Sequence, residues 1–503
     1  MLSMLFHKLR ITTMVHWGKN LSFFIIFLVL SSNVQGSYFY GWFGEKLEEP
    51  IQQTSLKRTL FTYVPLLTKN VYEALKEAEQ EFGSSSAPIQ IRIPGFKNII
   101  IFSDPQHITE IVKHESNGNL VKGYTINYIK KYLLGEGFAA LEMDNQIYKN
   151  LHKLFSPFFS SRHIANHFSL NRKWSEDFID SLKDRDDQVI NLENQIRIFA
   201  MGAISRSFLE YEISYDLSKK MNDCINRIVE YTFYKQINWP FVLPDFFPIE
   251  LNYIYQEAIG EMKVLAKKIL YNGVEKERNE KTFLQALRDS EYDEKIKVDQ
   301  IINIFFGGHE TTAHWLTMCF YRLLSRPDVF KRVQEEINNL PEEWQSNDMK
   351  NNRTPYLDAF TKEVLRLDSS ISVYGRDAVR NIKIGGYHVA KGSLVLLSQY
   401  HTHRNKKQWV KPYDFLPERF LAENKSEDSK YGKRHIRSYI PFGVGPRSCI
   451  GRFISEAEVK IFLTTFLRQS DFTLELVDKN DPEIEIVCTT RLKNGLPVKI
   501  IRH

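Results

Sequence analysis

The sequence has few cysteines, and they are widely separated. Its 503 residues contain four of them, Cys224, Cys319, Cys449 and Cys488, with no CxxC pair. This spacing points to neither a disulfide scaffold nor a zinc site.

The sequence also lacks a strong excess of charge of either sign. Its 67 basic and 61 acidic residues give a net charge of +6, which is too mild to indicate nucleic-acid binding. We find no internal repeat, low-complexity tract or domain-sized linker. One continuous domain is therefore expected over residues 37–503.

The apolar run near the N-terminus is short. Residues 21–30 are almost wholly apolar and follow the basic side chains of Lys8, Arg10 and Lys19. A spanning helix needs about 20 apolar residues. Residues 1–36 are therefore open to three interpretations: a secretory signal peptide, a short membrane anchor or a buried N-terminal helix. We expect a hydrophobic anchor or signal segment, and membrane association through it.

The spacing of apolar residues predicts a mainly helical protein with small β-sheets. Residues 71–82 follow helical spacing up to Gly83, and Asp104–Pro105 begins another helix. Most of residues 165–300 is also helical in pattern. The predicted β segments are a hairpin over residues 88–103 that turns at Pro94–Gly95, and residues 382–397, 472–476 and 497–501.

One stretch, residues 441–451, combines a cysteine, three glycines and an arginine. Glycines permit positive φ and close approach of the backbone to a bulky group. A cysteine at the start of a helix meets N–H groups and the positive end of the helix dipole, which favour thiolate. A thiolate beside an arginine suits haem, whose iron takes an axial thiolate and whose propionates need cations. The alternative is a turn-rich loop with an inert buried cysteine.

A second stretch, residues 305–312, places two glycines inside an apolar helical run over residues 298–324. Gly307 and Gly308 each cost about 1 kcal/mol relative to alanine in a helix, so some benefit should offset them. They would admit a flat ligand or let the helix open locally. The alternative is helix packing through the glycines.

The same helical run carries an acid and two threonines. Burial of Glu310 would be costly unless the carboxylate has a partner or works with protons. Thr311 and Thr312 are able to donate to carbonyl groups one turn earlier and bend the helix. The alternative places Glu310 at the surface.

A third feature is an acid–base pair at helical spacing. Glu363 and Arg366 share a helix face, and such i,i+3 pairs are usually solvated and contribute little to stability. A basic run over residues 430–437 precedes the cysteine stretch. It is either a solvated loop or a docking site for an acidic electron donor, through Lys433 and Arg434.

The cysteine stretch resembles the haem-ligand signature of the cytochrome P-450 family, Phe-x-x-Gly-x-Arg-x-Cys-x-Gly. Four motifs agree in order, over residues 60 to 500. The resemblance implies a mainly α fold with small β-sheets, in which haem lies between a long central helix and the cysteine-loop helix. The fixed positions of the signature are Phe442, Gly445, Arg447, Cys449 and Gly451.

The resemblance also implies roles for individual residues. Cys449 would be the axial ligand of the haem iron. The helical run is similar to the family motif (Ala/Gly)-Gly-x-(Asp/Glu)-Thr, so Glu310 and Thr311 would deliver protons to dioxygen while bulk water is limited. In this reading Gly307 and Gly308 leave room for oxygen and substrate.

Further positions follow from the same resemblance. Glu363, Arg366 and Arg419 would form a structural lock. Tyr148 and His152 stand where the family usually has Trp-x-x-x-Arg, with Lys153 as a nearby alternative to His152. The implied cofactor-binding residues are Cys449, Arg447, Arg376, Phe442, Gly443, Gly451, His152 and Tyr148.

The implied activity is that of a haem-thiolate monooxygenase that inserts one atom of dioxygen into an apolar substrate, such as a lipid, a sterol or a xenobiotic. The chain shows no flavin or iron–sulfur region, so a separate reductase or ferredoxin is implied. Two alternatives are a haem-thiolate isomerase or dehydratase and a non-catalytic haem-binding sensor. In a eukaryote the expected location is the endoplasmic reticulum membrane, with secretion as the alternative.

Overall fold

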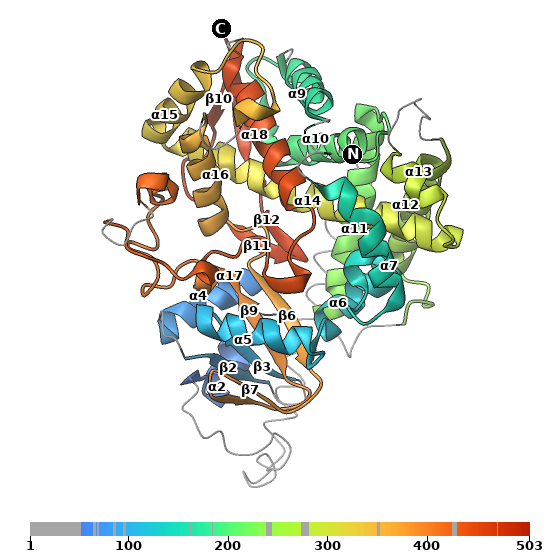
Figure 1. Ribbon diagram of the computed structural model, residues 1–503, viewed down its shortest axis with the longest axis vertical. Helices are drawn as coiled ribbons and strands as arrows, with labels where there is room; N and C mark the ends of the chain where they lie inside the picture. Colours follow the sequence, from blue (N-terminus) through green and yellow to red (C-terminus); the bar gives the residue numbers. More distant parts are fainter. Residues whose placement is uncertain are drawn as a thin grey trace.

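The computed structural model describes residues 52–503, apart from residues 64–66, 68–69, 84–86, 94–96, 161–162, 164, 166, 184, 238–243, 273–280, 350–352, 425–429 and 470. The described chain is mainly helical with small sheets, as predicted (Figure 1). The expected anchor or signal segment, residues 1–36, lies outside the described residues, and so does the Pro94–Gly95 turn. No helix in the described part is both long and apolar enough to cross a membrane.

The helices follow one another along the whole described chain. They are α2 (Leu56–Arg58), α4 (Val71–Phe82), α5 (Pro105–Ser116), α6 (Gly123–Ile129), α7 (Gln146–Phe155), α9 (Phe168–Lys183), α10 (Leu192–Ser207), α11 (Tyr215–Ile237), α12 (Glu250–Asn272), α13 (Phe283–Arg288), α14 (Glu294–Ser325), α15 (Pro327–Asn338), α16 (Pro355–Leu367), α17 (Gln399–Thr402) and α18 (Arg452–Arg468).

The strands are short and come mainly from the two ends of the described chain. They are β1 (Gln52–Gln53), β2 (Ile89–Arg92), β3 (Asn98–Phe102), β4 (Leu120–Val121), β5 (Val189–Asn191), β6 (Val373–Ala378), β7 (Ile382–Ile384), β8 (Tyr387–Val389), β9 (Leu394–Ser398), β10 (Phe472–Leu476), β11 (Ile484–Val487), β12 (Thr489–Leu492) and β13 (Pro497–Arg502).

Local signals set several of these boundaries. α4 ends at Gly83, which has φ +66° and donates its N–H to the Glu79 carbonyl at 2.8 Å. The Asp104 side chain caps α5 by accepting the Gln106 N–H at 2.8 Å. The predicted hairpin is confirmed, because β2 pairs antiparallel with β3.

The sheets join segments that are far apart in the sequence. The largest sheet in the described chain has the order β1-β2-β3-β9-β6-β4, and its central pair, β3 and β9, is parallel. β10, β13 and β5 form a second sheet, and β11 and β12 form a hairpin. In Figure 1 this hairpin lies near the centre of the molecule, close to α14.

The helix α14 is the long helix predicted over residues 298–324, and it crosses the middle of the molecule (Figure 1). The Asp293 side chain caps it by accepting the Ile296 N–H at 2.8 Å. α10, α16 and α18 pack against it. Trp315 of α14 shares one buried apolar cluster with Phe199 of α10 and Phe462 of α18. Burial on most sides explains why the helix is apolar nearly all round.

Candidate active site

One face of α14 is open, although the rest of its central part is packed. All residues from 298 to 321 are buried except five. The accessible residues are Ile304, Phe306, Gly307, Gly308 and Thr311. Four of these five stand at the i, i+3, i+4, i+7 spacing of a single helix face. The face is apolar except for one threonine. It can therefore accept a flat apolar group against the centre of the helix.

The two glycines of this face have different neighbours. A Cβ atom added at Gly307 would meet nothing within 4 Å, whereas one at Gly308 would lie 2.7 Å from the Ile204 side chain of α10. Gly307 thus leaves open space beside the helix, as predicted. Gly308 instead permits close packing on α10, which corrects its expected role of leaving room for oxygen and substrate.

Thr311 bonds within its own helix. Its hydroxyl donates to the Gly307 carbonyl at 2.9 Å, as predicted from the sequence. Its own carbonyl accepts from the Ser370 hydroxyl at 2.7 Å. The side-chain oxygen of Thr311 therefore has a fixed position on the open face.

Glu310 is buried, with 1% of its surface exposed, so the interpretation that places it at the surface is wrong. One carboxylate oxygen accepts from the Arg197 guanidinium of α10, and the other accepts from the Thr489 hydroxyl of β12 at 2.5 Å. Burial favours the neutral acid, but the charge of Arg197, the neighbouring His309 and the Thr489 hydroxyl together lower the pKa of Glu310 to about 2. Both oxygens are occupied by partners other than Thr311.

The cysteine loop folds back on itself directly before α18. The Cys449 N–H donates to the Phe442 carbonyl at 2.8 Å. Gly443 and Gly445 have φ values of +70° and +73°, and a Cβ atom at Gly445 would lie 2.6 Å from Val112 of α5. Glycine is therefore required at Gly445 both by conformation and by space.

The Cys449 side chain is accessible, yet protein atoms lie around it. Burial raises the pKa of its thiol, and the Gly451 N–H and the charge of Arg452 offset only part of this rise. The Gly451 N–H lowers the pKa of the Cys449 thiol, as predicted, but this effect alone does not stabilise the thiolate. A bound cation would deprotonate the thiol outright, so this residue suits an axial ligand of iron.

Cations gather on one side of this loop. The Arg447 guanidinium lies 4.2 Å from the centre of the Tyr148 ring and donates to the Leu141 carbonyl. Arg376 of β6 pairs with Glu115 of α5, Nε to Oε1, at 2.6 Å. These residues come from separate parts of the chain and approach one another only in the fold.

A third cation at this place, Lys122, was not predicted from the sequence. Burial lowers the pKa of Lys122 to about 7, and the nearby charges of Arg447 and Arg376 act in the same direction. Repulsion of Lys122 by these two arginines indicates a cluster of cations that is able to bind an anionic group. No motif marks Lys122, because it lies in the short link between β4 and α6.

The two predicted residues on α7, Tyr148 and His152, differ in burial. Tyr148 is buried, and its ring stacks on Phe138 at 4.9 Å between centroids. His152 is exposed, and its Nδ1 atom lies 3.1 Å from the Ser156 hydroxyl. Lys153 is exposed as well. The structure thus brings Tyr148 to Arg447, and the His152 ring lies beside the Tyr148 ring, 5.9 Å between centroids.

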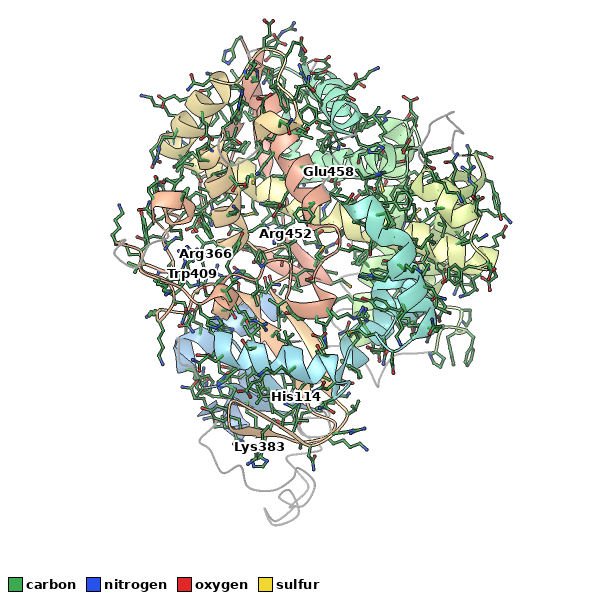
Figure 2. All side chains as sticks on the ribbon, in the orientation of Figure 1. His114, Arg366, Lys383, Trp409, Arg452 and Glu458 are labelled. Atoms are coloured by element: carbon green, nitrogen blue, oxygen red, sulfur yellow. The ribbon has the colours of Figure 1, made fainter. Side chains whose placement is uncertain are left out.

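Glu363, Arg366 and Arg419 form a fully buried ion-pair group. Arg366 donates from Nε and from a terminal nitrogen to the two Glu363 oxygens at 2.8 and 2.7 Å. Arg419 Nε donates to Glu363 at 3.1 Å, and all three side chains are 0% exposed. The solvated interpretation of the pair is therefore wrong. The Arg366 guanidinium also lies 4.9 Å from the centre of the Trp409 ring, and Figure 2 labels both residues.

The basic run before the cysteine loop does not present all its charges to solvent. Arg434 packs over Trp409 and donates to the Arg419 carbonyl at 2.9 Å. Burial lowers its pKa to about 10. Of the predicted docking pair, Lys433 is exposed, whereas Arg434 packs against Trp409.

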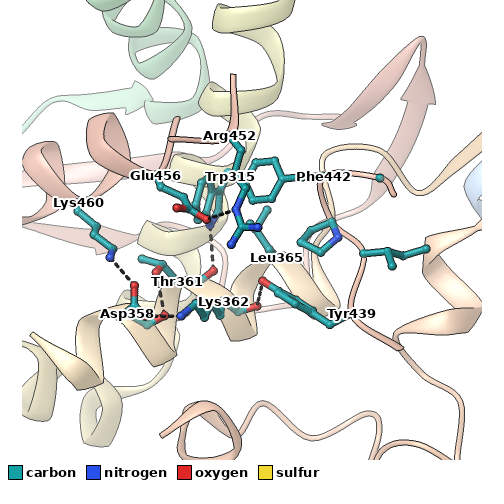
Figure 3. A pocket seen from close by; sticks show the side chains of 13 residues that line it. Trp315, Asp358, Thr361, Lys362, Leu365, Tyr439, Phe442, Arg452, Glu456 and Lys460 are labelled. Atoms are coloured by element: carbon teal, nitrogen blue, oxygen red, sulfur yellow. Dashed lines mark hydrogen bonds and ion pairs between the residues drawn. The ribbon is translucent and has the colours of Figure 1, made fainter. Parts of the chain in front are cut away.

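A pocket opens on the side of the loop that faces α16 and α18 (Figure 3). Phe442 and Trp315 are among its apolar lining residues. Asp358 bridges two lysines there, Lys362 of its own helix and Lys460 of α18. The pocket therefore combines aromatic surface with a mixed-charge rim beside the cysteine loop.

Comparisons with known proteins agree with this geometry. A family model described as Cytochrome P450 matches residues 55–496. Cytochrome P450 3A6 of Oryctolagus cuniculus is 23% identical over 432 residues, which cover 81% of this chain and 82% of that protein. Cytochrome P450 3A18 of Rattus norvegicus is 24% identical over 506 residues, which cover 95% of each.

A solved structure shows the same fold. It is a crystal structure of the cytochrome P450DA heme domain, with a TM-score of 0.76 and 20% identity, covering 90% of this chain and 97% of that one. The accessible cysteine and the open face of α14 suit a haem group. Because the family model spans most of the sequence, this chain belongs to the cytochrome P450 family of haem-dependent monooxygenases.

Proposed function

We propose that this enzyme inserts one oxygen atom into an apolar organic substrate, such as a lipid, a sterol or a xenobiotic, with electrons from a separate reductase or ferredoxin. The observation that carries the substrate class is the open face of α14. It presents Ile304 and Gly307, with Thr311 as its one polar side chain. Burial of apolar surface on this face would drive binding of an apolar substrate.

The test is incubation with a library of apolar compounds, NAD(P)H, a reductase and isotopically labelled dioxygen. We expect one labelled oxygen atom in the product, and turnover that depends on the reductase. Conversion of a peroxide without the reductase would instead indicate an isomerase or dehydratase.

The residues of this chain would hold haem from two sides. Cys449 would ligate the iron, with Phe442, Gly443 and Gly451 shaping its loop. Haem supplies the redox chemistry that activates dioxygen. Arg447 and Arg376, joined by Lys122, Tyr148 and His152, would bind the propionates.

Thr311 would hold a proton at its hydroxyl on the open face, and Glu310 would replenish that proton. The position of the Thr311 hydroxyl on the open face supports its part of this division, and Glu310 is held by Arg197 and Thr489. Proton supply from a fixed group limits the entry of bulk water.

Thr311→Ala should keep haem but divert reducing equivalents to peroxide. Without the hydroxyl, no fixed proton donor remains on the open face. We expect product per NAD(P)H to fall by about tenfold or more, which is within the usual contribution of a general acid. The measurement is the ratio of product to peroxide, with Thr312→Ala as the control. Coupling equal to wild type would remove Thr311 from the relay.

The electron donor would dock beside the pocket of Figure 3, which borders the cysteine loop. Lys433→Glu should slow haem reduction by an acidic donor severalfold at low salt, and the difference should shrink as salt rises. Lys331→Glu on α15, whose side chain is 77% exposed, is a control for surface charge. Equal reduction rates for Lys433→Glu and wild type would exclude this docking surface.

Membrane association would come from residues 1–36, whose sequence has an apolar core after basic residues. Phe246 and Phe247 are exposed in the described chain and would add a second contact. Deletion of residues 1–36 should move most of the protein from the membrane fraction to the supernatant. Retention of the truncated protein on membranes would show that another surface anchors it.

A further inference from the structure

The strand β12 is linked by hydrogen bonds to both members of the proposed proton relay. Its Thr489 hydroxyl donates to Glu310 at 2.5 Å. Its Thr490 N–H donates to the Ser370 carbonyl at 2.9 Å, and the Ser370 hydroxyl donates to the Thr311 carbonyl at 2.7 Å. One short strand is therefore bonded to Glu310 directly and to Thr311 through a single residue.

On its other side Glu310 is held by α10. The Arg197 guanidinium pairs with Glu310 and also with Glu193, one turn earlier on α10, at 3.3 Å. The Leu492 N–H of β12 donates to Glu193 at 3.3 Å. The four side chains of this group, which we call the Glu310 clamp, are all at most 5% exposed: Glu193, Arg197, Glu310 and Thr489.

The two acids of the Glu310 clamp have pKa shifts in opposite directions. Burial raises the pKa of Glu193, which favours its neutral form. Glu310 stays charged, because Arg197 and the Thr489 hydroxyl oppose the effect of burial. Two carboxyl groups thus share one guanidinium, and the pKa is raised for Glu193 and lowered for Glu310, the acid next to Thr311.

The hairpin turn that carries Thr489 is constrained. β11 and β12 pair from Val487 and Thr489, so Cys488 alone forms the tip of the hairpin. Cys488 has φ +63°, a left-handed conformation that non-glycine residues adopt rarely. Its side chain packs against the apolar cluster that contains Phe305 of α14. A shift at the tip would therefore move the Thr489 hydroxyl relative to Glu310.

We propose that Thr489 and Arg197 are positioning residues that hold Glu310 in a closed state, and that displacement of the β11–β12 hairpin releases the Glu310 carboxylate to take up a proton from water and pass it to Thr311. This inference rests on the proposed function. In the closed state both oxygens of Glu310 are occupied, so proton supply is slow until the clamp opens.

The test uses the substrate-free holoenzyme. Thr489→Val removes the hydroxyl, Thr489→Ser restores it, and Thr490→Val is a matched control in the same strand, because Thr490 bonds the Ser372 hydroxyl rather than Glu310. Each variant is supplied with NADPH and a reductase, which deliver both electrons that reduction of dioxygen requires, in oxygenated buffer made with H2O or D2O. Its carbon monoxide spectrum shows whether the haem site is intact.

We expect Thr489→Val to consume oxygen up to about tenfold faster than wild type, since a hydrogen bond to a buried charge contributes on that scale. Its solvent isotope effect should be smaller, and Thr489→Ser and Thr490→Val should behave as wild type. A rate for Thr489→Val equal to wild type, or equal acceleration in Thr490→Val, would overturn the proposal.

A second readout does not depend on turnover. In urea unfolding, Thr489→Val and Glu310→Gln should show non-additive midpoint shifts, because each removes the same hydrogen bond. Additive shifts would overturn the clamp. Failure of the proposed function would appear differently, as the absence of substrate oxygenation in wild type while the unfolding coupling persists.

Discussion

Cys449→Ser is expected to abolish the red-shifted Soret band of the reduced carbon monoxide complex. A serine hydroxyl is a far weaker donor to iron than a thiolate, so the spectrum would lose the feature that thiolate ligation produces. Turnover with a reductase should fall below detection. The measurement is the difference spectrum of the dithionite-reduced protein with carbon monoxide.

A matched control is available in the same chain. Cys488 is also a free cysteine, and it packs against the apolar cluster beside α14. Cys488→Ser should keep the red-shifted band, because its side chain is not on the cysteine loop. An unaltered band in Cys449→Ser, or its loss in Cys488→Ser, would contradict the assignment of Cys449 as the ligand.

Glu363→Gln is expected to destabilise the fold by about 3–5 kcal/mol, the usual cost of removing one partner from a buried ion pair. The amide would leave the guanidinium groups of Arg366 and Arg419 buried without a countercharge. Their remaining acceptors include backbone carbonyls, such as those of His403 and Pro412 at 2.7 and 2.6 Å from Arg366. Urea unfolding and the yield of haem-loaded protein are the measurements.

The control for this prediction is an exposed pair at helical spacing. Lys331 and Glu335 of α15 lie 3.9 Å apart, and their side chains are 77% and 62% exposed. Glu335→Gln should change stability by at most about 0.5 kcal/mol. A loss in Glu363→Gln no larger than that of the control would mean that the buried group does not act as a structural lock.

Much of the fold could be predicted from local patterns. The apolar run over residues 298–324 marked α14, and Gly83 and Asp104 marked the end of one helix and the start of the next. These features depend on neighbours within a few residues, so the sequence carries them directly. The pairing of β3 with β9 is not visible in this way, because almost 300 residues separate the two strands and only the sheet brings them together.

The candidate site also contains features that only folding creates. Gly307 and Gly308 look equivalent in sequence, yet only Gly308 meets a side chain of α10. Lys122 has no motif around it, and it joins Arg376 and Arg447 only through folding. Contacts between distant segments leave no local signal in a single sequence.

The sequence by itself determined the chemistry that is available: a cysteine in a glycine-rich loop, and an acid beside a threonine on a long apolar helix. Residue type and spacing suffice for this, because ligation and proton transfer depend on the groups themselves. Only the tertiary structure decided how those groups are held. It closed Glu310 between Arg197 and Thr489 and turned Arg434 inward against Trp409, because burial and charge balance are set by elements that meet from distant parts of the chain.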